Sequence, residues 1–309
     1  MRYLFPFTIV TTMMTYLLVF AGGIVRVAGA GLGCPDWPKC FGRWLPPTNI
    51  NQLPDFIDPV KFNFVLAWIE YGNRLLGVIM GALILITFFI ALKYFRNSNK
   101  IFLPILTAFV LTLIEGWLGG VLVKSMLNPI TITLHLVLAL IIIGLLIYAS
   151  MHAHYIRSPL AERESKYPNK LKVFVIVLIV ITLVEIILGT EIRAGLDISR
   201  KNNPMVDSYF LLKMLGSFKY IHSILGIALI WIVYMIKKYV SLSDNPSQIM
   251  NLSVSSIIFL ILFQLIIGES LVFLRVEPLL QLFHLWGASL ILGVGVLQLT
   301  VLNRSSDNK

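Results

Sequence analysis

The chain has 309 residues, of which 58% are hydrophobic and only 13% are charged. Soluble domains carry about 25% charged residues, so this composition excludes a soluble enzyme and is typical of a membrane protein. The two cysteines are too few for a disulfide-rich scaffold or a tetracysteine metal site. The net charge of +10 would fit a nucleic-acid partner, but basic residues that flank apolar segments are typical of cytoplasmic membrane loops, and we assign no nucleic-acid partner.

Eight segments are apolar and long enough to cross about 30 Å of hydrocarbon, which takes roughly 20 residues. In lipid such segments satisfy their backbone only as helices, so the sequence predicts an all-α, polytopic protein with eight transmembrane helices. The first segment is longer than a signal-peptide core of about 7–15 residues, and we expect it to be retained. The predicted spans are 5–25, 70–92, 101–123, 129–151, 171–192, 219–236, 252–274 and 279–302.

The distribution of Lys and Arg predicts the orientation of these helices. If both termini are cytoplasmic, the two short outer loops hold only Lys124 and Arg275, while the cytoplasmic segments hold most of the remaining basic residues. The long connections 26–69 and 193–219 cross largely regardless of their charge. We therefore predict that both termini lie in the cytoplasm.

An internal repeat relates the two halves of the chain. Its coincidences fall at polar and small positions, which chance similarity between apolar segments would not produce. We infer two tandem, pseudo-symmetric four-helix bundles, 1–156 and 157–309, related by an axis along the membrane normal. A shift of 149 residues pairs Glu70-Tyr-Gly-Asn73-Arg74 with Lys219-Tyr-Ile-His222-Ser223, Glu115 with Gln264, Gly119 with Gly268 and His135 with His284, and a second shift pairs Gly22-Gly-Ile-Val-Arg26 with Gly189-Thr-Glu-Ile-Arg193.

The repeated histidines indicate heme binding. His222 and His284 are expected at similar depth on facing helices near the outer side, which is how a bundle presents two imidazoles to one heme iron. The alternative is that a membrane histidine only hydrogen-bonds a neighbouring helix. In the first half the partner of His135 is Asn73, a poor iron ligand, so a porphyrin there would keep an open position beside Glu70, one turn away on the same face. This asymmetry suggests that one bundle relays electrons and the other transforms a substrate.

Other polar residues in or near the spans have simpler interpretations. Three arginines at the outer helix ends suit heme propionates, or else they reach lipid phosphates: Arg26, Arg74 and Arg193. Four acids should face the bundle interiors, because a charge against lipid costs several kcal/mol: Glu70, Glu115, Glu185 and Glu269. His152 and His154 lie far from the outer layer, and we interpret them as solvated or interfacial.

The segment Cys34-Pro-Asp-Trp-Pro-Lys-Cys40 lies in the long first outer connection. An oxidising compartment permits a disulfide there, and five intervening residues make a closable loop. Two roles remain open at this point. The pair is either a structural clip or a thiol–disulfide couple that exchanges with an external reductant or gates the neighbouring site.

These motifs, together with Gly31-Leu-Gly33 before the first cysteine and Gly119-Gly120, resemble those of bacterial heme A synthases over essentially the whole chain. The resemblance implies a protein of the bacterial inner membrane that oxidises the C8 methyl of heme O to the formyl group of heme A, for cytochrome oxidase biogenesis. It implies a resident heme b bound by His222 and His284, and a substrate heme held by His135 in the N-terminal half. It also implies that Glu70 is the catalytic acid and that Cys34 and Cys40 are the outer-loop pair.

The chain departs from the family pattern at three points. Asn73 stands where the motif Glu-x-x-His-Arg has its histidine, Ser223 stands where the repeat motif has arginine, and a second outer cysteine pair is missing between Arg193 and Lys219. We expect Asn73 to hydrogen-bond a water or an oxygen species at the substrate iron. The alternatives to a synthase are a b-type heme electron carrier and a heme-binding or heme-delivery paralogue that does not oxidise the methyl group.

The expected partners follow from the chemistry of heme, which is poorly soluble and reactive. Heme O synthase and cytochrome oxidase assembly factors are the expected protein partners, besides the heme O substrate and membrane lipid. No segment identifies a docking surface, and the sequence is compatible with an oligomer.

Overall fold

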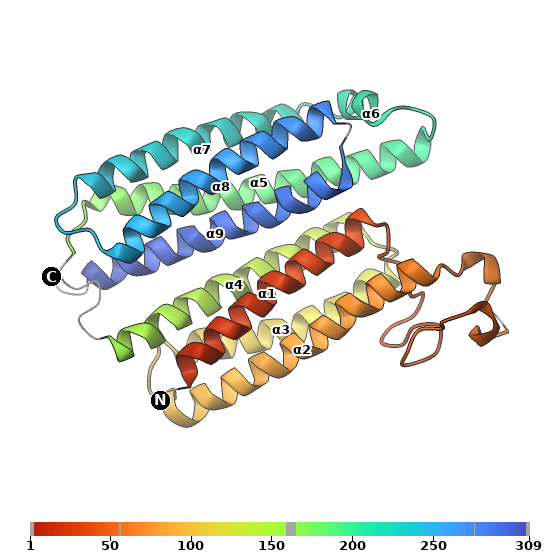
Figure 1. Ribbon diagram of the computed structural model, residues 1–309, viewed down its shortest axis with the longest axis horizontal. Helices are drawn as coiled ribbons and strands as arrows, with labels where there is room; N and C mark the ends of the chain where they lie inside the picture. The colour runs from red at the N-terminus through yellow and green to blue at the C-terminus, as the bar shows by residue number, and fades with distance from the viewer. Residues whose placement is uncertain (1–2, 56, 159–164, 275, 307–309) are drawn as a thin grey trace. The chain divides into compact units, whose positions relative to one another are not determined.

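The computed structural model describes residues 3–55, 57–158, 165–274 and 276–306, and the regular secondary structure of these ranges consists of helices joined by turns and loops (Figure 1). Eight of the helices are long and apolar enough to span a membrane, which confirms the predicted all-α, multi-pass architecture. The elements are α1 (Leu4–Val27), η1 (Ile50–Gln52), η2 (Pro59–Lys61), α2 (Phe64–Phe95), α3 (Phe102–Lys124), α4 (Pro129–Arg157), α5 (Asn169–Asn202), α6 (Ser208–Met214), α7 (Phe218–Ser241), α8 (Gln248–Phe273) and α9 (Pro278–Ser306).

Several helices extend beyond the predicted spans. Helix α2 begins six residues earlier than predicted, because the Asn63 side chain caps it by accepting a hydrogen bond from the Leu66 amide at 3.1 Å. Helix α5 continues for ten residues past 192 to Asn202. Hydropathy marks only the lipid-facing part of a helix, whereas polar residues continue the same backbone hydrogen bonding beyond the hydrocarbon.

The chain divides into two compact units, Met1–Leu146 and Ile147–Lys309. In unit 1 a stripe of buried threonines on α1 faces α2. The hydroxyls of Thr11 and Thr87 lie 2.9 Å apart, and the Thr15 hydroxyl donates to the sulfur of Met80 at 3.4 Å. Small residues that hydrogen-bond across helices are typical of close packing in membranes. Helices α3 and α4 join this packing through a buried apolar cluster with α2: Met80, Ile84, Ala108, Ile142 and Leu146.

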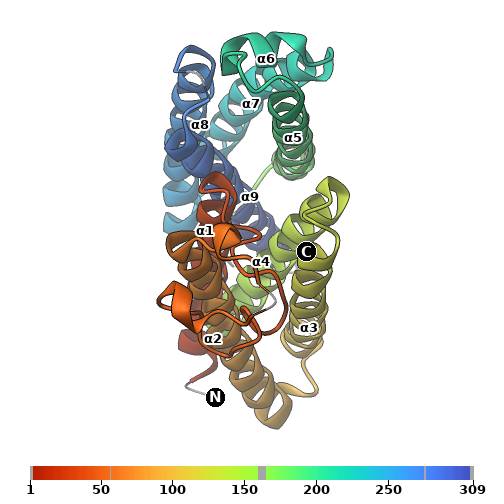
Figure 2. The ribbon, with the colours of Figure 1, turned by 90° about the vertical axis from the view of Figure 1, so that its right-hand side faces the viewer.

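In unit 2, α5 packs against α7 and α9, and α8 packs against the same two helices (Figure 2). Leu178, Ile236 and Ile257, from three of the four helices, lie in the buried core. The Gln298 side-chain amide on α9 donates to the Ser253 hydroxyl on α8 at 3.1 Å, so this bundle also has a buried polar link. The four helices therefore enclose a shared interior.

The long connection between α1 and α2 folds onto the first turns of α2 (Figure 1). Its own small core contains Cys34, Cys40 and Phe41, which pack with Ala67 of α2. Short 3-10 turns η1 and η2 complete the connection. This connection, called the outer loop after its expected side of the membrane, is therefore built on unit 1 and brings sequence-distant residues to one end of α2.

Candidate functional site

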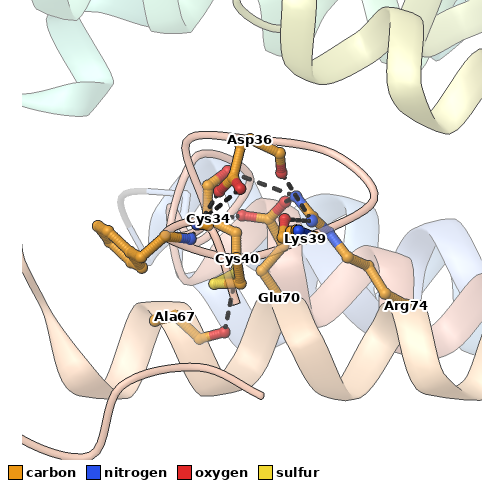
Figure 3. Close-up of a disulfide and its surroundings, with 9 residues drawn as sticks. Cys34, Asp36, Lys39, Cys40, Ala67, Glu70 and Arg74 are labelled. Atoms are coloured by element: carbon orange, nitrogen blue, oxygen red, sulfur yellow. Dashed lines mark hydrogen bonds and ion pairs between the residues drawn. A yellow bond between two sulfur atoms is a disulfide. The ribbon is translucent and has the colours of Figure 1, made fainter. Parts of the chain in front are cut away.

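The two cysteines form a disulfide in the outer loop of unit 1 (Figure 3). Their Cα atoms lie 4.7 Å apart, and the two residues are 0% and 1% exposed. The sulfur of Cys34 lies 3.6 Å from the carbonyl oxygen of Ala67 on α2. Because thiol–disulfide exchange requires access to a sulfur atom, this burial favours a structural clip over exchange with an external reductant.

Glu70 lies beneath this loop in the second turn of α2 and is only 4% exposed. One carboxylate oxygen forms an ion pair with Arg74, one turn further along α2. The other accepts a hydrogen bond from the backbone amide of Cys34 at 2.7 Å. Both oxygens are therefore occupied, and one of them ties the catalytic candidate directly to the disulfide loop (Figure 3).

The guanidinium of Arg74 donates hydrogen bonds both to the same loop and to the Glu70 carboxylate. Its Nη1 donates to the carbonyl oxygens of Asp36 and Lys39, both at 2.8 Å, while its Nη2 donates to Glu70. A guanidinium has five donors, and at least three of those of Arg74 are committed here. Arg74 therefore anchors the loop.

Close backbone approach explains two glycines in this region. A Cβ atom on Gly33 would lie 2.4 Å from the carbonyl oxygen of Leu66, so the loop rests on the backbone of α2 itself. A Cβ atom on Gly120 of α3 would lie 3.0 Å from the ring of Trp37, which packs on that glycine. The cysteine loop thus contacts both α2 and α3.

The carboxylate of Asp36 stabilises the turn that follows the disulfide. It accepts hydrogen bonds from the amides of Phe41 at 2.6 Å and Gly42 at 2.8 Å. Both of these residues have a left-handed backbone, with φ of 54° and 74°. The side chain therefore holds two consecutive residues in a conformation that is unusual for one of them.

His135 and Asn73 are the remaining candidates in unit 1. The Nδ1 atom of His135 on α4 contacts a carboxylate oxygen of Glu115 on α3. The Oδ1 atom of Asn73 is buried and has no hydrogen-bond partner among the described residues. A buried amide oxygen without a partner fits a site that accepts a hydrogen bond from a bound group or water.

In unit 2, His222 of α7 and His284 of α9 face each other with ring centroids 6.1 Å apart and planes inclined at 72°. An imidazole nitrogen binds a metal at about 2.0 Å and the centroid lies about 1.1 Å behind it, so two histidines on opposite sides of one iron have centroids about 6.2 Å apart. The observed spacing agrees with this value. The pair therefore fits the iron of a heme.

The surroundings of these two rings are also specific. The Nδ1 atom of His222 lies 2.6 Å from a carboxylate oxygen of Glu185 on α5. A Cβ atom on Gly189 would lie 3.7 Å from Cε1 of His222, and one on Gly268 would lie 3.4 Å from Cε1 of His284. Each ring edge is thus packed against a glycine of a neighbouring helix.

Arg193 on α5 shares its guanidinium between two side chains. It pairs with Asp197 at 3.0 Å and donates to the side-chain oxygen of Gln281 on α9. Arg26 lies in the last turn of α1. The donors of Arg193 thus meet side chains, whereas those of Arg74 converge on backbone carbonyls.

The structure corrects the inward orientation expected of Glu269 and the first of the two interpretations given for His152, which was solvation or an interfacial position. Glu269 is exposed near the end of α8, where a carboxylate can leave the hydrocarbon, and it does not face the interior. His152 is 9% exposed and packs between the rings of Tyr148 and Tyr155, with centroids 4.4 and 5.7 Å away, so it is not solvated. Aromatic residues four before and three after His152 on its helix indicate this packing in the sequence.

The structure also brings together residues that the motifs did not pair. Glu115 and Glu185 were expected to face the interior, but their contacts with His135 and His222 were not predicted. Asp36 was not identified as a structural residue. A sequence feature that indicates these contacts is the glycine four residues after each of the two glutamates. This spacing places the glutamate and the glycine on one helix face, which is the face that meets the helix carrying the histidine.

Comparison with known proteins identifies the family. The family model described as cytochrome oxidase assembly protein (COX15-CtaA) matches residues 6–296. A protein of Shewanella oneidensis named heme A synthase is 35% identical over 146 residues, which are 45% of this chain and 42% of that protein. One of Pelagibacter ubique with the same name is 29% identical over 222 residues, 63% of this chain and 62% of that protein. The matches thus span less than two thirds of these relatives. Because the family model covers nearly the whole sequence, the chain belongs to the COX15-CtaA family of cytochrome oxidase assembly proteins.

Proposed function

We propose that this protein acts as a heme A synthase, which oxidises the C8 methyl group of heme O to a formyl group for cytochrome oxidase biogenesis. The observation that carries the proposal is the facing pair His222 and His284, whose 6.1 Å centroid spacing suits one iron. At the equivalent positions of the repeat, unit 1 has one histidine, His135, and Asn73. Relatives named heme A synthase support the same activity.

Unit 2 is proposed to hold the resident heme b. His222 and His284 would bind its iron through their ring nitrogens, and Arg193 on α5 would pair with a propionate. When bound, heme b supplies one-electron redox chemistry. The protein's part is to fix the two imidazoles, which the contacts of Glu185, Gly189 and Gly268 accomplish.

Unit 1 is proposed to hold heme O as substrate. His135 would bind its iron from one side, and Arg26 at the end of α1 would meet a propionate. Asn73 is proposed to hydrogen-bond a water beside the iron, because its buried Oδ1 lacks any other partner in the described part of the chain. His135 would then be the one histidine that holds the substrate iron in unit 1, whereas the methyl group to be oxidised lies on the ring periphery.

Glu70 is proposed to handle the protons released at the methyl carbon. Its carboxylate is fixed by Arg74 and by the Cys34 amide, so it cannot rotate freely and its remaining lone pairs have a defined position. Protein groups alone cannot oxidise a methyl group, so an iron centre and an external redox partner supply the oxidising power. Cys34 and Cys40 are proposed to act as a structural clip that keeps this carboxylate in place.

We place the protein in the bacterial plasma membrane with both termini cytoplasmic. The eight apolar helices and the bias of Lys and Arg toward the cytoplasmic loops support this arrangement. Heme O synthase and cytochrome oxidase assembly factors are proposed partners, since direct transfer protects a reactive and poorly soluble heme.

The test is to co-express the chain with a heme O synthase in a host that makes no heme A, and to identify the extracted hemes by mass. Heme A should appear with the unchanged chain and with the control His154→Ala, and it should be lost with His222→Ala. Heme-loaded protein that yields only heme O and heme b would contradict the proposal. That result would favour the electron carrier or the delivery paralogue.

A further inference from the structure

A short pattern recurs on three of the helices. In each case a glutamate or glutamine is followed four residues later by a glycine, and this spacing places both on one helix face. The three instances are Glu115 with Gly119 on α3, Glu185 with Gly189 on α5, and Gln264 with Gly268 on α8.

This face meets a histidine of a neighbouring helix each time. Glu115 contacts Nδ1 of His135, and Glu185 lies 2.6 Å from Nδ1 of His222. Gly189 packs against Cε1 of His222, and Gly268 packs against Cε1 of His284. At His222 the acid and the glycine therefore touch two neighbouring atoms of the same imidazole ring.

Helix α1, which corresponds to α5 in the repeat, lacks the acid of this pattern. The shift that aligns Gly22 with Gly189 places Leu18 at the position of Glu185. The helix that corresponds to α7 is α2, which carries Asn73 where α7 carries His222. In this pair of helices the acid is missing together with the histidine, whereas His284 is retained opposite the neutral Gln264. An acid therefore occurs in the repeat only where a histidine faces it.

We infer that Glu185 and Glu115 are positioning residues for the heme-binding histidines. This inference rests on the proposed function, in which iron is the metal that these histidines meet. The Nδ1 atoms of His222 and His135 are buried, and each is in ion-pair contact with its carboxylate without regular hydrogen-bond geometry in the described residues. With heme bound, each carboxylate would accept the Nδ1 proton of its histidine, which would fix the tautomer and leave Nε2 free as the ligand.

The two histidines that would hold the unit 2 heme are therefore unequal. His222 is backed by a carboxylate, whereas the Nδ1 atom of His284 has no partner in the described residues, and the corresponding residue Gln264 is a neutral amide. A carboxylate at Nδ1 makes an imidazole a stronger donor and adds nearby negative charge. Both effects stabilise ferric iron and lower the reduction potential of the heme.

The experiment is a redox titration of heme b in the purified, detergent-solubilised full chain, with electron paramagnetic resonance to verify two nitrogen ligands. Glu185→Gln keeps an oxygen that can accept the Nδ1 proton but removes the charge, so the heme should remain bound. The equilibrium constant for reduction of its heme should increase at least tenfold. For one electron this corresponds to a rise in the midpoint potential of about 59 mV. The matched control is Glu191→Gln, which removes the same charge from an exposed position on α5 and should leave the potential unchanged.

A second variant tests the opposite direction. Gln264→Glu would give His284 the contact that Glu115 makes with His135, and it should lower the midpoint potential. A Glu185→Gln potential equal to that of the control, or shifts of the same sign in both variants, would overturn the inference. If Glu185→Gln loses its heme, Gln264→Glu decides alone, and an unchanged potential there is the overturning result.

The proposed function fails separately from this inference. Unchanged protein without Soret absorption would contradict both. A normally ligated heme b whose potential responds to neither variant would overturn only the role of the carboxylates.

Discussion

Glu70 has a structural role in the observed contacts and a chemical role in the proposed reaction. Its ion pair with Arg74 and its bond to the Cys34 amide make it part of the loop anchor. The proposed chemistry also requires it to accept a proton. Removing one partner from a buried ion pair leaves an uncompensated charge, which costs about 3–5 kcal/mol in a fully buried site. Substitutions on the two sides of the pair separate these roles.

We predict that Glu70→Gln folds and binds heme b but accumulates heme O or a hydroxylated intermediate, because the amide can accept the Cys34 bond but cannot take up a proton. Arg74→Gln keeps the carboxylate and should retain part of the activity while loosening the loop. Heme products are measured by mass, and loop cleavage is measured by limited proteolysis. Heme A at the level of the unchanged protein in Glu70→Gln would remove Glu70 from the mechanism.

Asn73 provides a second prediction at the same scale. Asn73→His should add a second imidazole to unit 1 and convert its loaded heme to a low-spin, two-histidine form, detected by electron paramagnetic resonance. The unchanged protein should show that form only in unit 2. Two low-spin, two-histidine hemes in the unchanged protein would contradict the proposed open position.

The sequence predicted these residues unequally, for a physical reason. The repeat identifies His135, His222, His284 and Asn73, because duplicated positions can be compared directly. The partners of Arg74 are backbone carbonyls 35 and 38 residues earlier in the chain, and carbonyl groups carry no residue identity. A motif can therefore indicate Arg74 but not what it binds.

At the scale of elements, the outer loop depends on contact between two backbones. Because Gly33 has no side chain, the loop backbone can contact the carbonyl of Leu66. A Cβ atom at this position would clash with the backbone of α2, which cannot move aside as a flexible side chain could. The disulfide adds to this ordering. By the chain-entropy argument, closing so short a loop stabilises the folded form by about 2 kcal/mol.

We predict that Gly33→Ala displaces the loop from α2, because the added Cβ would lie 2.4 Å from the Leu66 oxygen. Protease cleavage within the loop should become at least tenfold faster in detergent, and Cys34 should become accessible to alkylation after mild reduction. The control is Gly77→Ala on α2, whose Cβ meets no atom within 4 Å. Equal cleavage rates for the two variants would show that the close approach is not needed.

The helices themselves were predictable because lipid imposes one requirement on all of them, a long apolar segment. The ends were less predictable, since they depend on particular polar residues. Asn63 begins α2 by capping it, whereas α5 continues past its apolar part through Arg193, Asp197 and Arg200. The pattern of hydropathy contains no information on such extensions.

At the scale of the whole molecule, the orientation in the membrane can be measured directly. We predict that Lys124→Cys is labelled by a membrane-impermeant maleimide in intact cells and that Asn99→Cys is labelled only after lysis, because the first ends α3 on the expected outer side and the second precedes α3 on the expected inner side. Both positions are exposed. The native disulfide should give no background, and the reverse labelling pattern would contradict the proposed orientation.

The anchoring of the outer loop has a consequence for biogenesis. The amide of Cys34 and the carbonyls of Asp36 and Lys39 find their partners only on α2, which the ribosome synthesises later. The connection can therefore reach its final shape only after α2 has been synthesised. Oxidation of the thiols before that moment would close a ring that still lacks the surface on which it docks.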